Sequence, residues 1–239
     1  MPQPTIAQQL RMSRLLRHYL TYCDLQEIAA SSQRIYAQNI GDWLRWRGEQ
    51  HHPDDARKIT VEELREHFRY LKHDHIPHRA NRYRPGACSS RGLSASSRNL
   101  RWRVLASFWK WLGAEGQLRR DQQDFFTARR VPCPPVPKKK RKGVEESAIA
   151  ALLATCTAHD ERTLRDRAAI LLLAQTGMRI SELAQLREAR CQFAEREALI
   201  VGKGGKERMV FWSAQAAAAL DDYRAIRRPS PSGYVLLGT

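Results

Sequence analysis

Apolar residues recur three and four positions apart along most of the chain, a spacing that predicts helices rather than strands. The run at 164–174 is nearly all apolar but too short to cross a bilayer, so we expect it to be a buried core helix. In the helix before it, Ile149, Leu152 and Leu153 are expected to face inward. The helical pattern covers residues 5–22, 35–46, 61–71, 98–114, 145–154, 164–174 and 213–226.

Polar residues mark where two of these helices begin. Thr60 and Glu63 are spaced as in a capping box, in which each side chain bonds the backbone N–H of the other. Ser94 to Ser97 provide hydroxyls that can cap the helix at 98–114. Both signals support a bundle of helices in the first half of the chain.

The regular helical pattern is interrupted after Thr176. Gly177 permits a backbone turn that a side chain would hinder, and a second helix is expected to start at once with Arg179 in its first turn. Glu182 lies three residues further on, on the same helix face, where its carboxylate can pair with Arg179. This segment therefore predicts a guanidinium held in place by a carboxylate.

Two short strand-like runs on either side of a glycine-rich turn then predict a β-hairpin. Residues 198–201 and 207–211 are the expected strands, and the turn at 202–206 contains three glycines that supply positive φ angles. Residues 234–237 are expected to form a final strand. A hairpin lysine close to Arg179 would suit an anion such as a phosphate, although arginines and lysines at such positions are also common surface residues.

Positive charge is unevenly distributed along the 239 residues, which carry a net charge of +16. Residues 1–143 contain 28 Lys and Arg against 13 Asp and Glu, whereas residues 144–239 contain 13 against 12. This asymmetry predicts a polyanionic partner for the N-terminal part. No basic amphipathic helix with an aromatic apolar face stands out, which favours nucleic acid over a membrane surface.

The basic side chains expected to contact phosphates lie in two helices, in a long loop at 73–93 and in a Pro-rich linker at 131–143. The linker separates a helical DNA-binding domain at 1–130 from a second domain at 144–239. Its PKKKRK segment also resembles a nuclear-import signal, but phosphate contact accounts for the same residues. The predicted contact residues are Arg34, Arg45, Arg47, Arg79, Arg82, Arg84, Arg98, Arg101, Lys138, Lys139, Lys140, Arg141 and Lys142.

Two motifs in the second half, LRDRAAILLLAQTGMRISELAQL and LIVGKGGKERMV, resemble the first half of the catalytic domain of tyrosine recombinases of the phage-integrase and Xer type. The resemblance runs from about residue 145 to the end, and SSQRIY and WLRW upstream give it weaker support. It implies a mainly α fold with a small β component. A SAM-like helical core-binding domain would be followed by an incomplete α+β catalytic domain, and the two would clamp DNA.

The resemblance also implies roles for individual residues. In that family a tyrosine attacks the scissile phosphate without metal or cofactor, while arginines stabilise the phosphoryl charge and a hairpin lysine protonates the leaving oxygen. Arg179 matches the first arginine and Lys203 the lysine, with Lys206 as the alternative lysine. Glu182 would orient Arg179.

The family's later motifs, His-x-x-Arg and the nucleophilic tyrosine, have no match in this sequence. No histidine follows His159, and Tyr223 and Tyr234 do not lie where the nucleophile belongs. We therefore assign no nucleophile. We expect a C-terminally truncated, DNA-binding member of the family that is inactive in DNA recombination and DNA integration by itself.

Two other functions remain open at this point: a truncated regulator that occupies recombination sites, and a helical transcription factor unrelated to recombinases. The expected partners are double-stranded DNA and other recombinase protomers. Five scattered cysteines without a CxxC pair argue against disulfides and a zinc site, so no metal or cofactor is expected. No signal segment or membrane span is evident, and we expect a cytoplasmic, nucleoid-associated protein.

Overall fold

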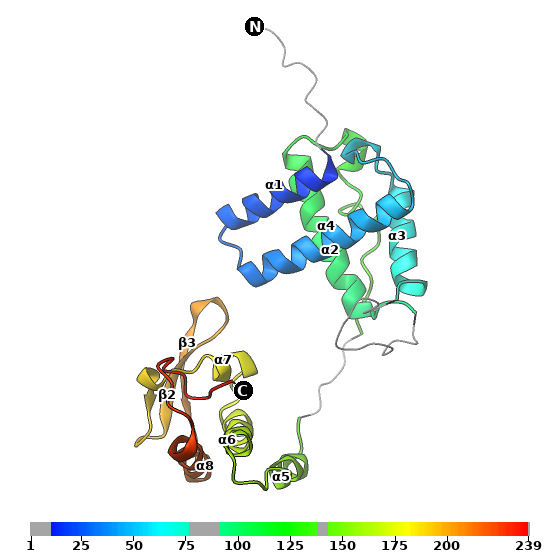
Figure 1. Cartoon of the computed structure of the whole chain (residues 1–239). Coiled ribbons are helices and arrows are strands. Elements are labelled where there is room, and N and C mark those ends of the chain that lie inside the picture. Colours follow the sequence, from blue (N-terminus) through cyan, green and yellow to red (C-terminus); the bar gives the residue numbers. More distant parts are fainter. Residues whose placement is uncertain (1–10, 77–90, 138–142, 239) are drawn as a thin grey trace. The chain divides into compact units, whose positions relative to one another are not determined.

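The computed structural model describes residues 11–76, 91–137 and 143–238, and the chain divides into two compact units, Met1–Lys139 and Lys140–Thr239 (Figure 1). Each unit has its own hydrophobic core. The assignment of a DNA-binding domain to residues 1–130, a linker to 131–143 and a catalytic-type domain to 144–239 stays a prediction.

The N-terminal unit is a helical bundle built around aromatic side chains. Trp43, Phe108 and Tyr19 are fully buried, and the Tyr19 ring lies 5.1 Å from that of Phe108. Tyr36 and Leu44 are partly buried against this core. The helices are α1 (Met12–Leu25), α2 (Ala30–Glu49), α3 (Val61–His73) and α4 (Ala95–Ala114), with short 3-10 turns at Ala56–Lys58 and Arg120–Gln122.

Both predicted helix caps are present, but one is only half of a capping box. The Thr60 hydroxyl accepts from the Glu63 N–H at 3.1 Å, and the Ser94 hydroxyl accepts from the Ser97 N–H at 3.2 Å. The cap places the start of α4 at Ala95, three residues earlier than the apolar pattern indicated. The Glu63 carboxylate does not return to the Thr60 backbone, because it pairs with Arg47 instead.

Arg47 is therefore not a phosphate contact. Its side chain is 3% exposed, forks onto both carboxylate oxygens of Glu63, and donates to the Pro53 carbonyl at 2.9 Å. A buried guanidinium needs such a partner because an unpaired charge is very costly in the protein interior. The prediction that Arg47 contacts DNA is wrong, since burial removes it from the surface.

The C-terminal unit combines helices with a three-stranded antiparallel sheet in the order β1-β2-β3, and α6 packs against α8 beside the sheet (Figure 1). The hairpin register pairs Glu197 with Phe211 and Val201 with Glu207. The mainly α fold with a small β component is thereby confirmed. Its elements are α5 (Glu146–Ala154), α6 (Glu161–Thr176), α7 (Ile180–Ala184), β1 (Cys191–Gln192), β2 (Glu197–Val201), β3 (Glu207–Phe211) and α8 (Ala214–Ile226), with 3-10 turns at Glu188–Arg190 and Lys203–Gly205.

Two predictions about this unit are wrong. The apolar residues of α5 are not buried: Leu152 is 52% exposed, and Leu153 is only partly buried against the core. The segment 234–237 is no strand, because its backbone forms a single bridge, between Tyr234 and Arg187, and then leaves the ladder.

The segment after α8 is instead held by arginines that donate to its backbone carbonyls. Arg165 of α6 donates to the Leu237 carbonyl at 3.1 Å, and Arg227 donates to the Tyr234 and Val235 carbonyls at 3.1 and 2.9 Å. Arg228 donates to the Gly238 carbonyl. These bonds fix an irregular segment that covers the core with Val235 and Leu237.

Within the described ranges, no helix combines the length and the apolar character that crossing a membrane would require.

Candidate functional site

The site begins where α6 ends. Gly177 closes α6 in the left-handed region, at φ 61°, and its N–H donates to the Leu173 carbonyl at 3.2 Å. Glycine adopts this conformation without the steric cost that a side chain would add. The turn places Arg179 immediately before α7, at its cap position rather than in its first turn.

Glu182 holds Arg179 in this position. Oε1 of Glu182 accepts from Nη1 of Arg179 at 2.6 Å, and Oε2 accepts from the Arg179 backbone N–H at 2.8 Å. The contact expected from their three-residue spacing is thus present. The Glu182 side chain is 5% exposed whereas that of Arg179 is 64% exposed, so the carboxylate is an internal anchor and the guanidinium faces solvent.

A second arginine, which the sequence analysis missed, completes the cluster. Arg208 of β3 donates from Nη2 to Oε2 of Glu182 at 2.9 Å and from Nη1 to Oε1 at 3.3 Å. Strand alternation could have revealed it, because Arg208 is in phase with the buried Val210 and opposite the buried Ile200. The carboxylate therefore accepts four hydrogen bonds and lies between two positive charges.

This arrangement lowers the pKa of Glu182 from 4.5 to about 2. The main cause is the hydrogen bonding from Arg208, followed by the Arg179 backbone N–H and then by the Arg179 side chain. Glu182 is consequently ionised at neutral pH. With two guanidiniums around one carboxylate, the cluster has a net charge of +1.

The hairpin turn lies directly against this cluster. A Cβ on Gly202 would come within 3.3 Å of Glu182 Oε1 and 3.4 Å of Arg208 Nη1, so only glycine fits without displacing its neighbours. The Gly202 N–H donates to the Lys206 carbonyl at 2.7 Å, which closes the turn. Gly202, the residue just before Lys203, thus packs against Glu182, the partner of Arg179.

The two candidate lysines differ in what the structure shows. Lys203 belongs to the short 3-10 turn at Lys203–Gly205, and its side chain lies outside the described part of the chain. Lys206 is exposed at the end of the turn. The assignment of Lys203, with Lys206 as the alternative, stays a prediction.

Tyr223 and Tyr234, the two tyrosines after the hairpin, both contact other parts of the fold through their hydroxyls. Tyr223 is completely buried in α8, where its hydroxyl accepts from the Leu237 N–H at 3.0 Å. The Tyr234 hydroxyl accepts from Nη2 of Arg187 at 3.0 Å, and the Arg187 guanidinium lies 3.8 Å from the centre of the Tyr234 ring. Both tyrosines therefore have structural partners.

In the N-terminal unit, Asp42 joins two of the predicted DNA contacts. Its Oδ1 accepts from Arg45 at 3.2 Å and its Oδ2 accepts from Arg101 at 2.8 Å. Arg45 of α2 is 70% exposed and can reach a ligand, whereas Arg101 of α4 is only 13% exposed. The geometry favours Arg45 over Arg101 as a surface contact.

The other predicted contacts fall into two groups. Arg34 is exposed on α2 and Arg98 is half-buried on α4. The remaining ones lie outside the described residues and stay predictions: Arg79, Arg82, Arg84, Lys138, Lys139, Lys140, Arg141 and Lys142.

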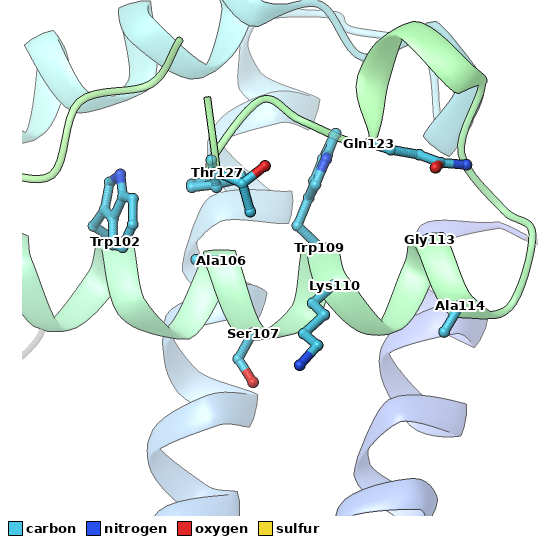
Figure 2. A pocket seen from close by; sticks show the side chains of 10 residues that line it. Trp102, Ala106, Ser107, Trp109, Lys110, Gly113, Ala114, Gln123 and Thr127 are labelled. Carbon is cyan, nitrogen blue, oxygen red and sulfur yellow. The ribbon is translucent and has the colours of Figure 1, made fainter. Parts of the chain in front are cut away.

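A pocket of about 690 Å³ runs along α4, but none of these arginines lines it (Figure 2). Trp102 and Trp109 extend from α4 toward the segment that carries Thr127. The Trp109 indole N–H donates to the Gln122 carbonyl at 2.7 Å, so this pocket belongs to the packing of α4 against residues 120–127. Among the residues that the structure describes, no group of His, Cys, Asp and Glu is placed to hold a metal ion.

Comparison with known proteins places the cluster in a family. A model described as "Phage integrase family" matches residues 142–239, the unit that contains Arg179, Glu182 and Arg208. The XerD tyrosine recombinase of Lacticaseibacillus casei is 28% identical over 222 residues, which cover 91% of this chain and 66% of that protein. The XerC tyrosine recombinase of Actinobacillus pleuropneumoniae is 32% identical over 139 residues, which cover 58% of this chain and 44% of that protein.

Solved structures show the same fold. The lambda integrase fragment of residues 75–356 bound to DNA has a TM-score of 0.63 at 15% identity, covering 96% of this chain and 71% of that one. A lambda integrase tetramer bound to a Holliday junction has a TM-score of 0.65 at 14% identity, covering 96% of this chain and 60% of that one.

The fold and the matched unit thus define an integrase-type protein. Residues 142–239 belong to the phage integrase family, and the chain is similar to tyrosine recombinases over about nine tenths of its length. It spans from under half to about two thirds of the length of the relatives described here.

Proposed function

We propose that this chain binds double-stranded DNA and that Arg179 and Lys203 grip one backbone phosphate, as the first part of a recombinase catalytic centre. One observation carries the proposal: the exposed guanidinium of Arg179 is anchored by a buried carboxylate against the hairpin turn that contains Lys203. An oriented guanidinium matches two oxygens of a phosphate, and the net charge of the cluster attracts it.

In this proposal each residue has a distinct task. Arg179 stabilises negative charge on the phosphoryl oxygens, and Lys203 provides the proton for the leaving oxygen. Glu182 orients Arg179. Arg34, Arg45 and the other basic residues of the N-terminal part neutralise neighbouring phosphates and set the position on the duplex.

Replacing Arg179 or Lys203 tests the proposal. Arg179→Ala and Lys203→Ala should each weaken binding to a mixed-sequence duplex and lower the slope of log affinity against log salt by about 0.9. Arg162→Ala is the matched control, because Arg162 is 77% exposed on α6 of the same unit and lies outside the cluster. If Arg179→Ala and Arg162→Ala bind alike, Arg179 does not grip a phosphate.

We also propose that these 239 residues do not exchange DNA strands by themselves. The support is that no His-x-x-Arg motif follows Arg179 and that Tyr223 and Tyr234 are both engaged in the fold. Incubation with nicked suicide duplexes should give no covalent adduct after denaturation. An adduct that disappears in Tyr223→Phe or Tyr234→Phe would identify a nucleophile and overturn this part.

Family membership removes the unrelated transcription factor from consideration. A regulator that occupies recombination sites depends on the same DNA binding and stays a prediction, as do assembly with other protomers and a cytoplasmic, nucleoid-associated location. Co-expression with an intact relative tests the regulator: recombination should fall, and should recover when Arg179 and Arg45 are both replaced by Ala.

A further inference from the structure

Arg208 occupies a place in the cluster that the roles above do not explain. It lies in β3, 26 positions after Glu182, and its guanidinium forks onto both carboxylate oxygens. The fork uses two donors in the geometry that fits a carboxylate best. Such a contact between a strand and α7 orients both partners.

The charge of Arg208 changes what Arg179 can do. Arg179 and Glu182 alone form a neutral pair, whose attraction for a phosphate is weak at a distance. Arg208 supplies a second positive charge to the same carboxylate, so the cluster keeps +1 while Arg179 stays anchored. The more exposed side chain, Arg179 at 64% against 40% for Arg208, is then the one that presents this charge to solvent.

The position of Arg208 on the hairpin also links two parts of the site. A Cβ on Gly202 would lie 3.4 Å from the Arg208 guanidinium and 3.3 Å from the Glu182 carboxylate. The turn that contains Lys203 therefore packs against the Glu182–Arg208 pair through Gly202. Movement of this pair would change the separation between α7 and the hairpin turn.

We infer that Arg208 is a positioning residue, which acts through Glu182 to fix Arg179 against the hairpin and to keep the pair from becoming neutral. The inference rests on the proposed function, because it concerns how Arg179 is presented to a DNA phosphate. The rival role is direct: Arg208 could itself contact a phosphate.

A double-mutant cycle distinguishes these roles. Arg208→Met should weaken binding to a mixed-sequence duplex by about tenfold, as expected if Arg179 loses about one charge-assisted contact with the phosphate. The same change should cost clearly less in an Arg179→Met background, since its positioning role acts through Arg179 and only its effect on the charge of the cluster remains. Additive losses would show an independent phosphate contact and overturn the inference, as would an Arg208→Met protein that binds like wild type.

Two further variants guard against a general loss of structure. Arg208→Lys keeps the charge but not the fork, so its affinity should fall between those of wild type and Arg208→Met. Arg162→Met removes an exposed charge from the same unit and should leave affinity nearly unchanged. If Arg208→Lys binds as weakly as Arg208→Met, the charge plays no part and that half of the inference is wrong.

NMR separates failure of the inference from failure of the proposed function. In Arg208→Met the Glu182 carboxylate should titrate at higher pH than in wild type, and the Arg179 backbone N–H should shift, while Arg162→Met changes neither. An unchanged Arg179 signal overturns the inference whatever the DNA result. If the Arg179 signal shifts but Arg179→Met itself leaves DNA affinity intact, the proposed function fails, and positioning for phosphate fails with it.

Discussion

Nη2 of Arg208 lies 2.9 Å from Oε2 of Glu182, across 26 positions of sequence and between a strand and a short helix. The same carboxylate accepts from the side chain and the backbone of Arg179. The buried Glu182 carboxylate thus joins the start of α7 to β3.

The low pKa of Glu182 predicts how acid affects the protein. Its value in the folded chain is about 2, against 4.5 ordinarily, so the folded state binds this proton more weakly than the unfolded chain. Its contribution to stability is complete above about pH 4.5 and is lost as the pH falls through about 2. Glu182→Gln lacks this contribution. As the pH falls through this window, the free energy of unfolding of wild type should therefore fall toward that of Glu182→Gln.

Urea unfolding of both proteins at several pH values measures the difference. Glu146→Gln, at an exposed position of α5, provides the control. A stability difference between wild type and Glu182→Gln that stays constant from about pH 5 to about pH 2 would contradict the assigned pKa.

Gly202→Ala should impair the site more than the fold. Its φ of −88° suits alanine, so the cost comes from contacts of 3.3 to 3.4 Å with Glu182, Arg208 and the Lys206 carbonyl. We expect several-fold weaker Arg179-dependent DNA binding. Gly204→Ala is the counterpart, since Gly204 has φ 75° but open space around it, and should lower stability by about 1 kcal/mol instead.

Thermal unfolding and DNA titration of both variants compare the two effects. Equal losses of affinity in Gly202→Ala and Gly204→Ala would mean that close packing against Glu182 is not what matters.

Tyr223→Phe should destabilise the C-terminal unit by about 1–3 kcal/mol, because it leaves the buried Leu237 N–H without its acceptor. Tyr234→Phe removes a hydroxyl whose bond to Arg187 is exposed, and should cost much less. Chemical denaturation measures both. Similar stabilities for the two variants would argue against the buried bond.

Arg47→Met should destabilise the N-terminal unit by about 3–5 kcal/mol, since it leaves the buried Glu63 carboxylate with only His52 Nδ1 nearby, at 3.6 Å. Replacing both partners, in Arg47→Met/Glu63→Leu, should restore much of the loss. Arg45→Met removes a 70% exposed arginine and should change stability by under about 1 kcal/mol. Calorimetry of the three proteins tests this, and a double variant as unstable as Arg47→Met would refute the pairing argument.

The sequence predicted those parts of the site that depend on local spacing. Arg179 and Glu182 are three residues apart, and the glycines of the turn indicate the hairpin directly. Arg208 was missed because its partner is distant in sequence, so that the contact depends on strand phase and on how the hairpin meets α7.

Errors arose where local patterns fit more than one environment. Tyr234 to Leu237 resemble a strand, and the Val235 N–H does donate to the Leu186 carbonyl in the bridge beside Arg187. The Leu237 N–H donates instead to the Tyr223 hydroxyl, so the ladder does not continue. In α5, apolar composition indicated a helix correctly, but it did not show that most of the helix surface stays exposed.

The arginines that hold the segment after α8 bind peptide oxygens, which every amino acid has. Arg165, Arg227 and Arg228 would keep these bonds whatever side chains stood at 234, 236 and 238, so long as the backbone path were kept. Sequence drift in this segment is thus constrained by the side chains alone: Val235 and Leu237 are buried, Leu236 packs partly against the core, and Tyr234 contacts Arg187.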